Sequence, residues 1–287
     1  MKQKILITGA SGMLGSDLVE VLKDEFQVIP LNHHDLDISD SHQVIKILEL
    51  EHPSILINAA AYTKVDLCET NFDQARRING EAVGILARAC EERKIKLVHF
   101  STDYVFDGKK KNPYVEEDLT HPLNAYGRSK LEGEKQILTC IKDFLLIRTS
   151  WLFGLKGPNF VDKIVERAHE YGLDSQKELK VVTDQIGSPT YSLDLAKALC
   201  FLIKGGIRGV FHITNSGVCS WYEFAVQILK RAGLGNVPVK PVQSEEFPSP
   251  TQRPSYSVLS NAKLEGEGYF MRLWQVGLEA YLSQESK

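Results

Sequence analysis

The sequence has few cysteines, no excess of positive charge and no long apolar run. Its five cysteines are odd in number and form no C-x-x-C pair, which argues against a disulfide framework and favours a reducing, cytoplasmic location. Lys and Arg number 34 against 37 Asp and Glu, so the formal net charge is −3 and no strong positive field is available to hold nucleic acid or an anionic membrane. No run of about 18 apolar residues occurs, so no membrane span is expected.

Short apolar runs alternate with amphipathic stretches through the first half of the 287 residues. Continuous apolar runs are typical of strands buried on both faces, and they predict strands at residues 4–8, 27–31, 55–58, 96–101 and 144–149. Apolar stripes at helical spacing predict helices at residues 13–23, 41–50 and 78–93. This alternation predicts an α/β fold, in which a doubly wound parallel sheet of the Rossmann type carries helices on both faces.

The pattern is less regular after residue 150. Helices are predicted at residues 160–169, 192–203 and 221–232, and strands at residues 180–183 and 210–214. Residues 236–254 are rich in proline and polar side chains, which predicts a loop that crosses the surface.

The segment GASGMLG, residues 9–15, follows the first predicted strand and opens the first predicted helix. Its glycines, Gly9, Gly12 and Gly15, permit a tight turn and a close approach of the backbone to a ligand, while the helix N-terminus offers free N–H groups. The spacing is G-x-x-G-x-x-G rather than the general G-x-G-x-x-G. Its position between a strand and a helix nevertheless indicates a site for a dinucleotide pyrophosphate.

The end of the second predicted strand leaves the choice of dinucleotide open. The general fingerprint expects an acidic residue there to hold the adenosine ribose, but the position is occupied by Asn32. No arginine replaces it to bind a 2′-phosphate, so neither NADH nor NADPH is favoured.

Tyr126 and Lys130 stand four residues apart, so they share one face if residues 124–137 form a helix. A free tyrosine titrates near pKa ~10, and a nearby ammonium favours its phenolate, which makes it a better proton donor or acceptor near neutral pH. The fourth predicted strand ends in Thr102 and Asp103, at the sheet edge that lines the ligand crevice. The Thr102 hydroxyl could hydrogen-bond a reacting carbonyl there while Tyr126 delivers the proton.

Seven segments in order resemble the dTDP-4-dehydrorhamnose reductase family of the extended short-chain dehydrogenase/reductase superfamily, from residue 8 to residue 257. They are the glycine loop, NAAAYTKVD at 58–66, STDYVFDG at 101–108, PLNAYG at 122–127, RTSW at 148–151, DQIGSPT at 184–190 and R-P-x-x-S at 253–257. They cover nearly the whole chain.

The resemblance implies that NADPH or NADH reduces the 4-keto group of a dTDP-4-keto-6-deoxy sugar, giving dTDP-L-rhamnose. It implies that Tyr126 is the proton donor to the C4 oxygen, that Lys130 lowers the tyrosine pKa and holds the nicotinamide ribose, and that Thr102 steadies the carbonyl. The implied cofactor contacts, beside Tyr126 and Lys130, are Gly9, Gly12, Met13, Leu14, Gly15, Asp37, Ile38, Ala60, Ala61, Tyr62 and Thr63. The implied substrate contacts are Thr102, Asp103, Trp151 and Arg253.

Three other functions remain open beside this one. A sugar-nucleotide dehydratase or epimerase of the same superfamily is disfavoured, because dehydratases carry an acidic residue after Thr-Asp and here Tyr104 follows. A reductase of a different deoxysugar nucleotide would differ only in its sugar. A non-catalytic dinucleotide-binding protein, resembling the regulatory subunit of methionine adenosyltransferase, is the third.

We therefore expect a dinucleotide-binding domain at residues 1–150, completed by returning segments near 180–215, and a smaller substrate-binding C-terminal lobe at residues 151–287 that is interleaved with it. The sugar nucleotide is expected in the cleft between them. No metal-ligand spacing is present, so no metal is predicted. The helices of the second half leave room for a homodimer face.

Overall fold

The computed structural model describes residues 2–171, 178–246 and 249–285. Its centre is a six-stranded sheet in the order β10-β5-β4-β3-β1-β2, in which every pairing is parallel. The strands are β1 (Lys4–Thr8), β2 (Gln27–Leu31), β3 (Ile55–Asn58), β4 (Lys96–Thr102), β5 (Phe144–Thr149) and β10 (Gly209–His212). The predicted doubly wound parallel sheet is confirmed.

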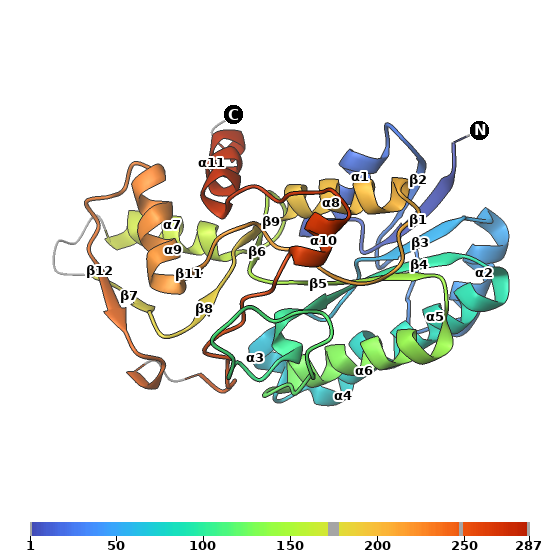
Figure 1. Cartoon of the computed structure of the whole chain (residues 1–287), viewed down its shortest axis with the longest axis horizontal. Helices are drawn as coiled ribbons and strands as arrows, with labels where there is room; N and C mark the ends of the chain where they lie inside the picture. Colours follow the sequence, from blue (N-terminus) through green and yellow to red (C-terminus); the bar gives the residue numbers. More distant parts are fainter. Residues whose placement is uncertain (1, 172–177, 247–248, 286–287) are drawn as a thin grey trace.

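Helices cover both faces of this sheet (Figure 1). On β1, Ile5 and Ile7 pack toward one face and Leu6 toward the other, as the period of two in a strand requires. The first face is covered by α1 (Met13–Leu22) and α8 (Ser192–Lys204). The second is covered by α2 (Ser41–Glu51), α5 (Ala82–Arg93) and α6 (Ala125–Cys140).

The helix predicted at residues 78–93 starts earlier and is less regular than expected. A short α4 (Phe72–Arg76), preceded by α3 (Val65–Cys68), continues into a π-helical turn, η1 (Arg77–Glu81), before α5 begins. The side-chain amide of Asn79 in this turn donates to the Ser129 hydroxyl of α6. The wide turn therefore lies where the two helices make a polar contact.

The second half of the chain builds a separate apolar core, which Phe153, Tyr191, Phe224 and Trp274 share. Figure 1 shows most of its elements gathered beyond one edge of the main sheet. The elements of the remaining chain are η2 (Asp103–Val105), β6 (Leu152–Phe153), α7 (Phe160–Tyr171), β7 (Leu179–Val182), β8 (Ile186–Gly187), β9 (Thr190–Tyr191), β11 (Cys219–Ser220), α9 (Trp221–Arg231), β12 (Val239–Val242), η3 (Ser244–Glu246), α10 (Ala262–Gly266) and α11 (Trp274–Glu285).

The prediction of a loop over residues 236–254 was wrong in part. β12 lies within it and pairs in parallel with β7. Val237 and Val242 are buried, and Pro241 is tolerated because β12 pairs with a single neighbour. Residues 247–248 of that stretch lie outside the described part of the chain.

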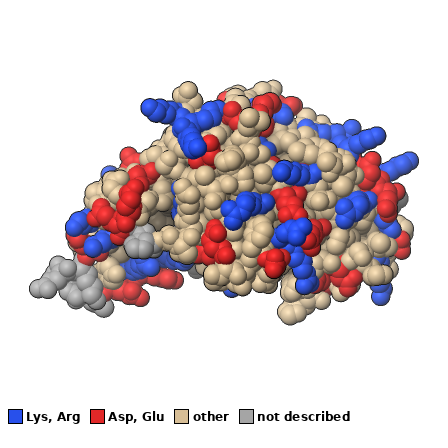
Figure 2. Space-filling view, turned by 90° about the horizontal axis from the view of Figure 1, so that it is seen from below, with Lys and Arg blue, Asp and Glu red and all other residues tan. Residues whose placement is uncertain are grey.

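Charges of both signs are interspersed over the face of the molecule that Figure 2 displays. Among the described residues, no helix combines the length and the apolar character that crossing a membrane requires.

Candidate functional site

The glycine loop lies where the strand order reverses, because β1 pairs with β2 on one side and β3 on the other. Gly9 has a φ of +66°, and a Cβ there would lie 2.6 Å from the backbone nitrogen of Ala60. A Cβ on Gly15 would lie 2.1 Å from the Gly9 carbonyl oxygen. The loop is thus packed against the end of β3, and Gly12 caps α1, with Met13 and Leu14 in its first turn. These contacts form a backbone cradle of the kind a pyrophosphate needs.

Asp37 and Ile38 lie beyond the end of β2. The Asp37 carboxylate accepts hydrogen bonds from the Ser39 backbone and hydroxyl, which lower its pKa, and lies 3.5 Å from the Arg77 guanidinium. Ile38 is buried. The Asn32 side chain accepts a hydrogen bond from the His34 backbone N–H at 2.9 Å and so stabilises the turn that follows β2.

The chain after β3 is held to α6 through Asn79. The Tyr62 backbone N–H donates to the Asn79 side chain at 2.8 Å, and the Asn79 amide donates back to the Tyr62 carbonyl at 2.9 Å. The Tyr62 ring packs in one small apolar cluster with Tyr126. Ala60 and Ala61 are half-buried and Thr63 is exposed, so this segment forms one wall beside Tyr126.

Tyr126 lies in the first turn of α6, directly against the turn that follows β4. A Cβ on Gly127 would lie 2.2 Å from the Tyr104 carbonyl oxygen, so only glycine permits this approach. The rings of Tyr104 and Tyr126 meet edge to face, with centroids 5.9 Å apart. Burial and the Asp103 charge raise the pKa of Tyr126, and a hydrogen bond with Thr102 opposes that rise. The phenol is therefore held in its protonated form.

Thr102 and Asp103 face this phenol from the carboxyl end of β4. The Thr102 hydroxyl donates to the Asp103 carboxylate at 2.9 Å and accepts from the Tyr104 backbone N–H at 3.2 Å. Burial raises the pKa of Asp103 to about 6, and hydrogen bonds from Ser257 and Thr102 oppose the rise. The R-P-x-x-S segment therefore reaches the site through Ser257.

Lys130 is buried one turn after Tyr126, but its Nζ turns toward β4. It donates to the Phe100 carbonyl at 2.6 Å and lies 3.3 Å from the Nε2 atom of His99. Burial lowers the Lys130 pKa to about 8. The expectation that a lysine ammonium lowers the pKa of Tyr126 stays a prediction, since burial is the main cause of the pKa shift of this phenol.

A cavity of about 1380 Å³ adjoins this cluster through Arg253, although Thr102, Asp103, Tyr126 and Lys130 do not line it. Arg253 lines it, with its guanidinium 3.1 Å from the Asp66 carboxylate and in hydrogen-bond contact with Tyr104. Trp151, predicted as a substrate contact, does not line the cavity. Its ring stacks on that of Trp221, which does, with the ring centroids 3.5 Å apart. The C-terminal part of the chain lines the cavity with Lys163, Arg167 and Lys180, and also with the carboxylates of Asp184 and Glu245.

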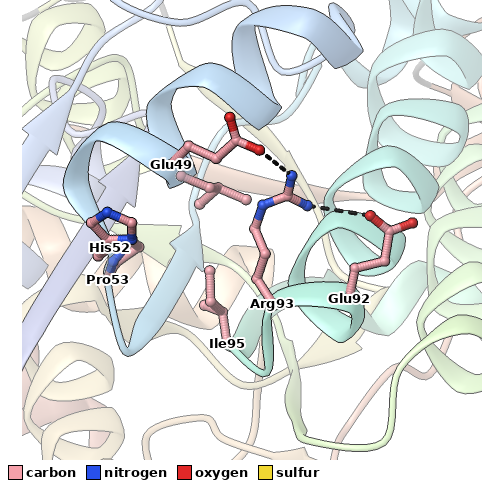
Figure 3. A pocket seen from close by; sticks show the side chains of 7 residues that line it. Glu49, His52, Pro53, Glu92, Arg93 and Ile95 are labelled. Carbon is pink, nitrogen blue, oxygen red and sulfur yellow. Dashed lines mark hydrogen bonds and ion pairs between the residues drawn. The ribbon is translucent and has the colours of Figure 1, made fainter.

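A second cavity of about 550 Å³ lies at the opposite end of the sheet, beside Pro53 and Ile95, which precede β3 and β4. There Arg93 bridges Glu49 at 2.8 Å and Glu92 at 3.3 Å (Figure 3). None of the predicted site residues lines this cavity. It is therefore distinct from the candidate site.

Several residues at the site were not predicted. Asn58 stands in a quoted motif and His99 interrupts an apolar strand, which is the one signal in the sequence that a polar side chain is buried there. Asn79 and Trp221 carry no such signal. Within the described part of the chain, no three His, Cys, Asp or Glu side chains gather as metal ligands.

The family model described as the RmlD substrate binding domain matches residues 3–287. The chain belongs to this family. It is 43% identical over 286 residues to the spore coat polysaccharide biosynthesis protein SpsK of Bacillus subtilis, covering 99% of this chain and 98% of that one. It is 39% identical to a dTDP-4-keto-6-deoxy-D-glucose reductase of Streptomyces niveus, covering 91% and 90%. The crystal structure of a dTDP-4-dehydrorhamnose reductase from Bacillus anthracis with NADP superposes with a TM-score of 0.94 at 39% identity, covering 99% of this chain and 100% of that one.

Proposed function

We propose that this member of the RmlD family is an NADPH- or NADH-dependent reductase, which reduces the 4-keto group of a dTDP-4-keto-6-deoxy sugar and gives dTDP-L-rhamnose. The relatives named as dTDP-4-dehydrorhamnose and dTDP-4-keto-6-deoxy-D-glucose reductases support the substrate class. The observation that carries the proposal is the contact of the Tyr126 phenol with Thr102 and Asp103 at the carboxyl end of β4, next to Tyr104 and the cavity-lining Arg253.

The glycine cradle fits the pyrophosphate of a nicotinamide dinucleotide. Side chains at Gly9 or Gly15 would collide with the backbone of the segment after β3 or of the loop itself, so these glycines permit the tight turn. The N-terminus of α1 offers N–H groups and a positive dipole end. In this proposal the cradle, with Met13 and Leu14, holds the pyrophosphate. Asp37 and Ile38 lie on the adenosine side, and residues 60–63 with Lys130 lie along the nicotinamide half.

The bound nicotinamide supplies the hydride. The protein supplies the proton from the Tyr126 phenol, whose raised pKa keeps it in the donating form at neutral pH. The Thr102 hydroxyl lies beside the phenol and donates its hydrogen to Asp103 at 2.9 Å. When the substrate binds, the hydroxyl turns this hydrogen from Asp103 to the substrate carbonyl and so orients it.

The cavity is assigned to the sugar nucleotide. The guanidinium groups of Arg253 and Arg167 suit its diphosphate, because arginine matches phosphate oxygens through a planar fork. Trp151 contributes by supporting Trp221, whose ring lines the cavity. The proposal keeps residues 1–150 with segments near 180–215 as the dinucleotide-binding domain, and 151–287 as the substrate lobe. Five free cysteines support a cytoplasmic location.

Tyr126→Phe tests the proposal, because it removes only the phenolic oxygen. We expect kcat to fall by about 10²–10⁴-fold while cofactor affinity stays within a few-fold, as for the loss of a general acid. NADPH and NADH oxidation are followed by absorbance with the dTDP-4-keto-6-deoxy sugar generated in place. Tyr191→Phe is the matched control, because it removes a phenolic oxygen from the C-terminal core.

An unchanged kcat in Tyr126→Phe would contradict the role of Tyr126 as the proton donor. The alternative function is reduction of a different deoxysugar nucleotide, and the Streptomyces niveus relative, a dTDP-4-keto-6-deoxy-D-glucose reductase, supports it. Comparison of the reaction product with authentic dTDP-L-rhamnose distinguishes the two activities. Cofactor binding without turnover would support the non-catalytic alternative instead.

A further inference from the structure

One carboxylate of the large cavity is bound to the arginine that the proposed function gives to the substrate diphosphate. Asp66 Oδ1 lies 3.1 Å from Arg253 Nη2, and both residues line the cavity. Asp66 belongs to the NAAAYTKVD motif and stands in the first turn of α3, and Arg253 follows 187 residues later. An acidic side chain beside a phosphate site needs an explanation, because like charges repel.

The segment that carries Arg253 is held in place by three hydrogen bonds that do not involve Asp66. They join the Asn124 side chain to the Gln252 carbonyl at 2.9 Å, the Ser255 hydroxyl to the Gly108 carbonyl at 3.1 Å, and the Ser257 N–H to the Ile186 carbonyl at 2.8 Å. Asp66 adds the pair with Arg253 and a 3.4 Å contact with the Ser249 hydroxyl. Removal of the Asp66 charge should therefore leave this segment where it is.

Arg253 has a second partner, the Tyr104 hydroxyl, and the two partners differ in charge and exposure. Tyr104 is 9% exposed, and burial raises its pKa to about 12, so it is a fixed and neutral partner. The Asp66 side chain is 51% exposed and has room to turn into solvent. A ligand that reaches Arg253 from the cavity can therefore replace Asp66, whereas Tyr104 stays in contact.

The charge on Asp66 makes it a rival of a phosphate group. Burial raises the pKa of this carboxyl, but hydrogen bonds from the segment 249–253 and the Arg253 charge lower it overall, so the group is ionised at neutral pH. An exposed ion pair contributes little to stability, whereas a phosphate binds two guanidinium N–H groups at once. Exchange of the carboxylate for a phosphate is therefore favourable, and the carboxylate reduces the net gain.

We propose that Asp66 competes with the substrate diphosphate for the Arg253 guanidinium and so sets the affinity for the sugar nucleotide. This inference rests on the proposed function, which places the diphosphate at Arg253. When the substrate binds, a phosphate replaces the Asp66 carboxylate, which turns into solvent. The reduction leaves the diphosphate unchanged, so the return of Asp66 to Arg253 favours release of the product.

Binding of dTDP tests the competition, because dTDP carries the diphosphate but no sugar to be reduced. Isothermal titration of the full chain at pH 7 compares the wild-type protein with Asp66→Asn, which removes the charge and keeps the shape of the side chain. We expect the variant to bind dTDP about 3–10-fold more tightly. Asp66→Ala should change the affinity in the same direction and provides a second variant.

Glu245→Gln is the matched control, because it removes one negative charge from the same cavity lining and leaves the pair of Asp66 with Arg253 in place. It should change the dTDP affinity by at most about two-fold, since solvent and salt screen separated charges. Equal gains in both variants would overturn the proposal, because they would reveal a general repulsion in the cavity.

Unchanged or weaker binding in Asp66→Asn would also overturn the proposal, because Asp66 would then orient Arg253 for the ligand. The direction of the effect separates the two roles. Loss of a merely structural contact does not make a ligand bind more tightly.

The second test follows the Asp66 carboxyl carbon by ¹³C NMR of the labelled full chain as the pH is lowered, with Asp66→Asn to assign the signal. Bound dTDP separates Asp66 from the Arg253 cation and places an anion beside it, and both changes raise the pKa of a carboxyl group. We therefore expect the pKa of Asp66 to rise when dTDP is saturating. The pKa of Asp40, which caps α2, should stay constant. An Asp66 pKa that falls or does not change would contradict the exchange.

These readouts need no turnover, so they separate the inference from the proposed function. A chain that shows the expected dTDP effects but reduces no dTDP sugar would refute the reductase function alone. A chain that reduces the sugar, but whose Asp66→Asn variant binds dTDP no more tightly, would refute the competition alone. A wild-type chain that does not bind dTDP would overturn both.

Discussion

His99 and His212 have similar surroundings but carry their ring N–H on opposite nitrogens. Both are buried on strands of the main sheet, and each has a basic side chain 3.3 Å from Nε2, Lys130 for the first and Arg148 for the second. His212 donates from Nδ1 to a carbonyl and offers the lone pair of Nε2 to the guanidinium. The Asn58 oxygen accepts from the Ala60 N–H, so the Asn58 NH₂ group donates to Nδ1 of His99, and the neutral imidazole carries its N–H on Nε2, toward the lysine.

The charged partners of Arg148 and Lys130 differ as well. Arg148 is bound in a two-point contact by Glu134, at 3.0 and 2.8 Å, with both side chains at most 5% exposed. Within the described part of the chain, Lys130 has no carboxylate in ion-pair contact. Arg148, which stays protonated, thus has the Nε2 lone pair of His212 and the Glu134 carboxylate as partners. Lys130, which can lose a proton, faces the N–H of His99 instead. The comparison separates a structural cation from a functional one.

The largest effect is expected from Arg148→Met, which leaves the Glu134 carboxylate buried without its partner. Breaking a buried pair in this way costs about 3–5 kcal/mol of the free energy of unfolding. Chemical denaturation measures it. The matched control is Arg208→Met, which removes a similar two-point contact with Asp143 from a side chain that is 64% exposed, and should cost at most about 1 kcal/mol. Equal losses in both variants would contradict the distinction.

A smaller effect that depends on pH is expected from Lys130→Met. The Lys130 pKa is about 8 in the folded chain against an ordinary value of 10.5, so between these values the unfolded chain binds more protons and folding is favoured as pH rises. Below about pH 8 the buried amine reduces stability. The wild-type protein should therefore gain about 3 kcal/mol relative to the variant between pH 8 and 10.5.

Denaturant midpoints of the two proteins across that pH range measure the gain, which begins at lower pH if His99 lowers the lysine pKa further. Lys96→Met serves as a control, because this buried lysine forms an ion pair with Asp143 at 3.3 Å. A difference that stays flat with pH for Lys130→Met would show that this amine is solvated or paired after all.

The sequence predicts the main sheet well because its strands are buried on both faces, and such strands read as continuous apolar runs. Elements whose structure depends on contacts with distant parts of the chain could not be predicted from the sequence. β12 contains Pro241 and forms only because β7 lies beside it. The π-helical turn at Arg77–Glu81 widens the helical period by hydrogen bonds from i to i+5, and the apolar pattern of the sequence did not predict it. The contact of Asn79 with Ser129 of α6 lies in this turn.

For the candidate site, the motifs identify which side chains gather, and the structure brings Thr102, Asp103 and Tyr126 together. They do not reveal where Lys130 points, because its partners come from β4, some 30 residues earlier. The stacking of Trp151 on Trp221 joins residues that are far apart in the sequence. Protonation states are harder still to predict from the sequence. The tautomer of His99 depends on the Asn58 amide, and the orientation of that amide depends on the Ala60 backbone N–H.

The smallest effect is expected from Thr8→Val, which keeps the shape of the side chain and removes the hydroxyl that donates to Asn58 Oδ1 at 2.7 Å. Loss of one buried hydrogen bond should cost about 1 kcal/mol in denaturant unfolding. The His99 tautomer should not change, because the Ala60 N–H still fixes the Asn58 oxygen at 3.2 Å. A change of tautomer in this variant would mean that the Thr8 hydroxyl, and not the backbone, sets the direction of the amide. The two buried histidines would then differ through a side chain that mutation can replace, rather than through the fold itself.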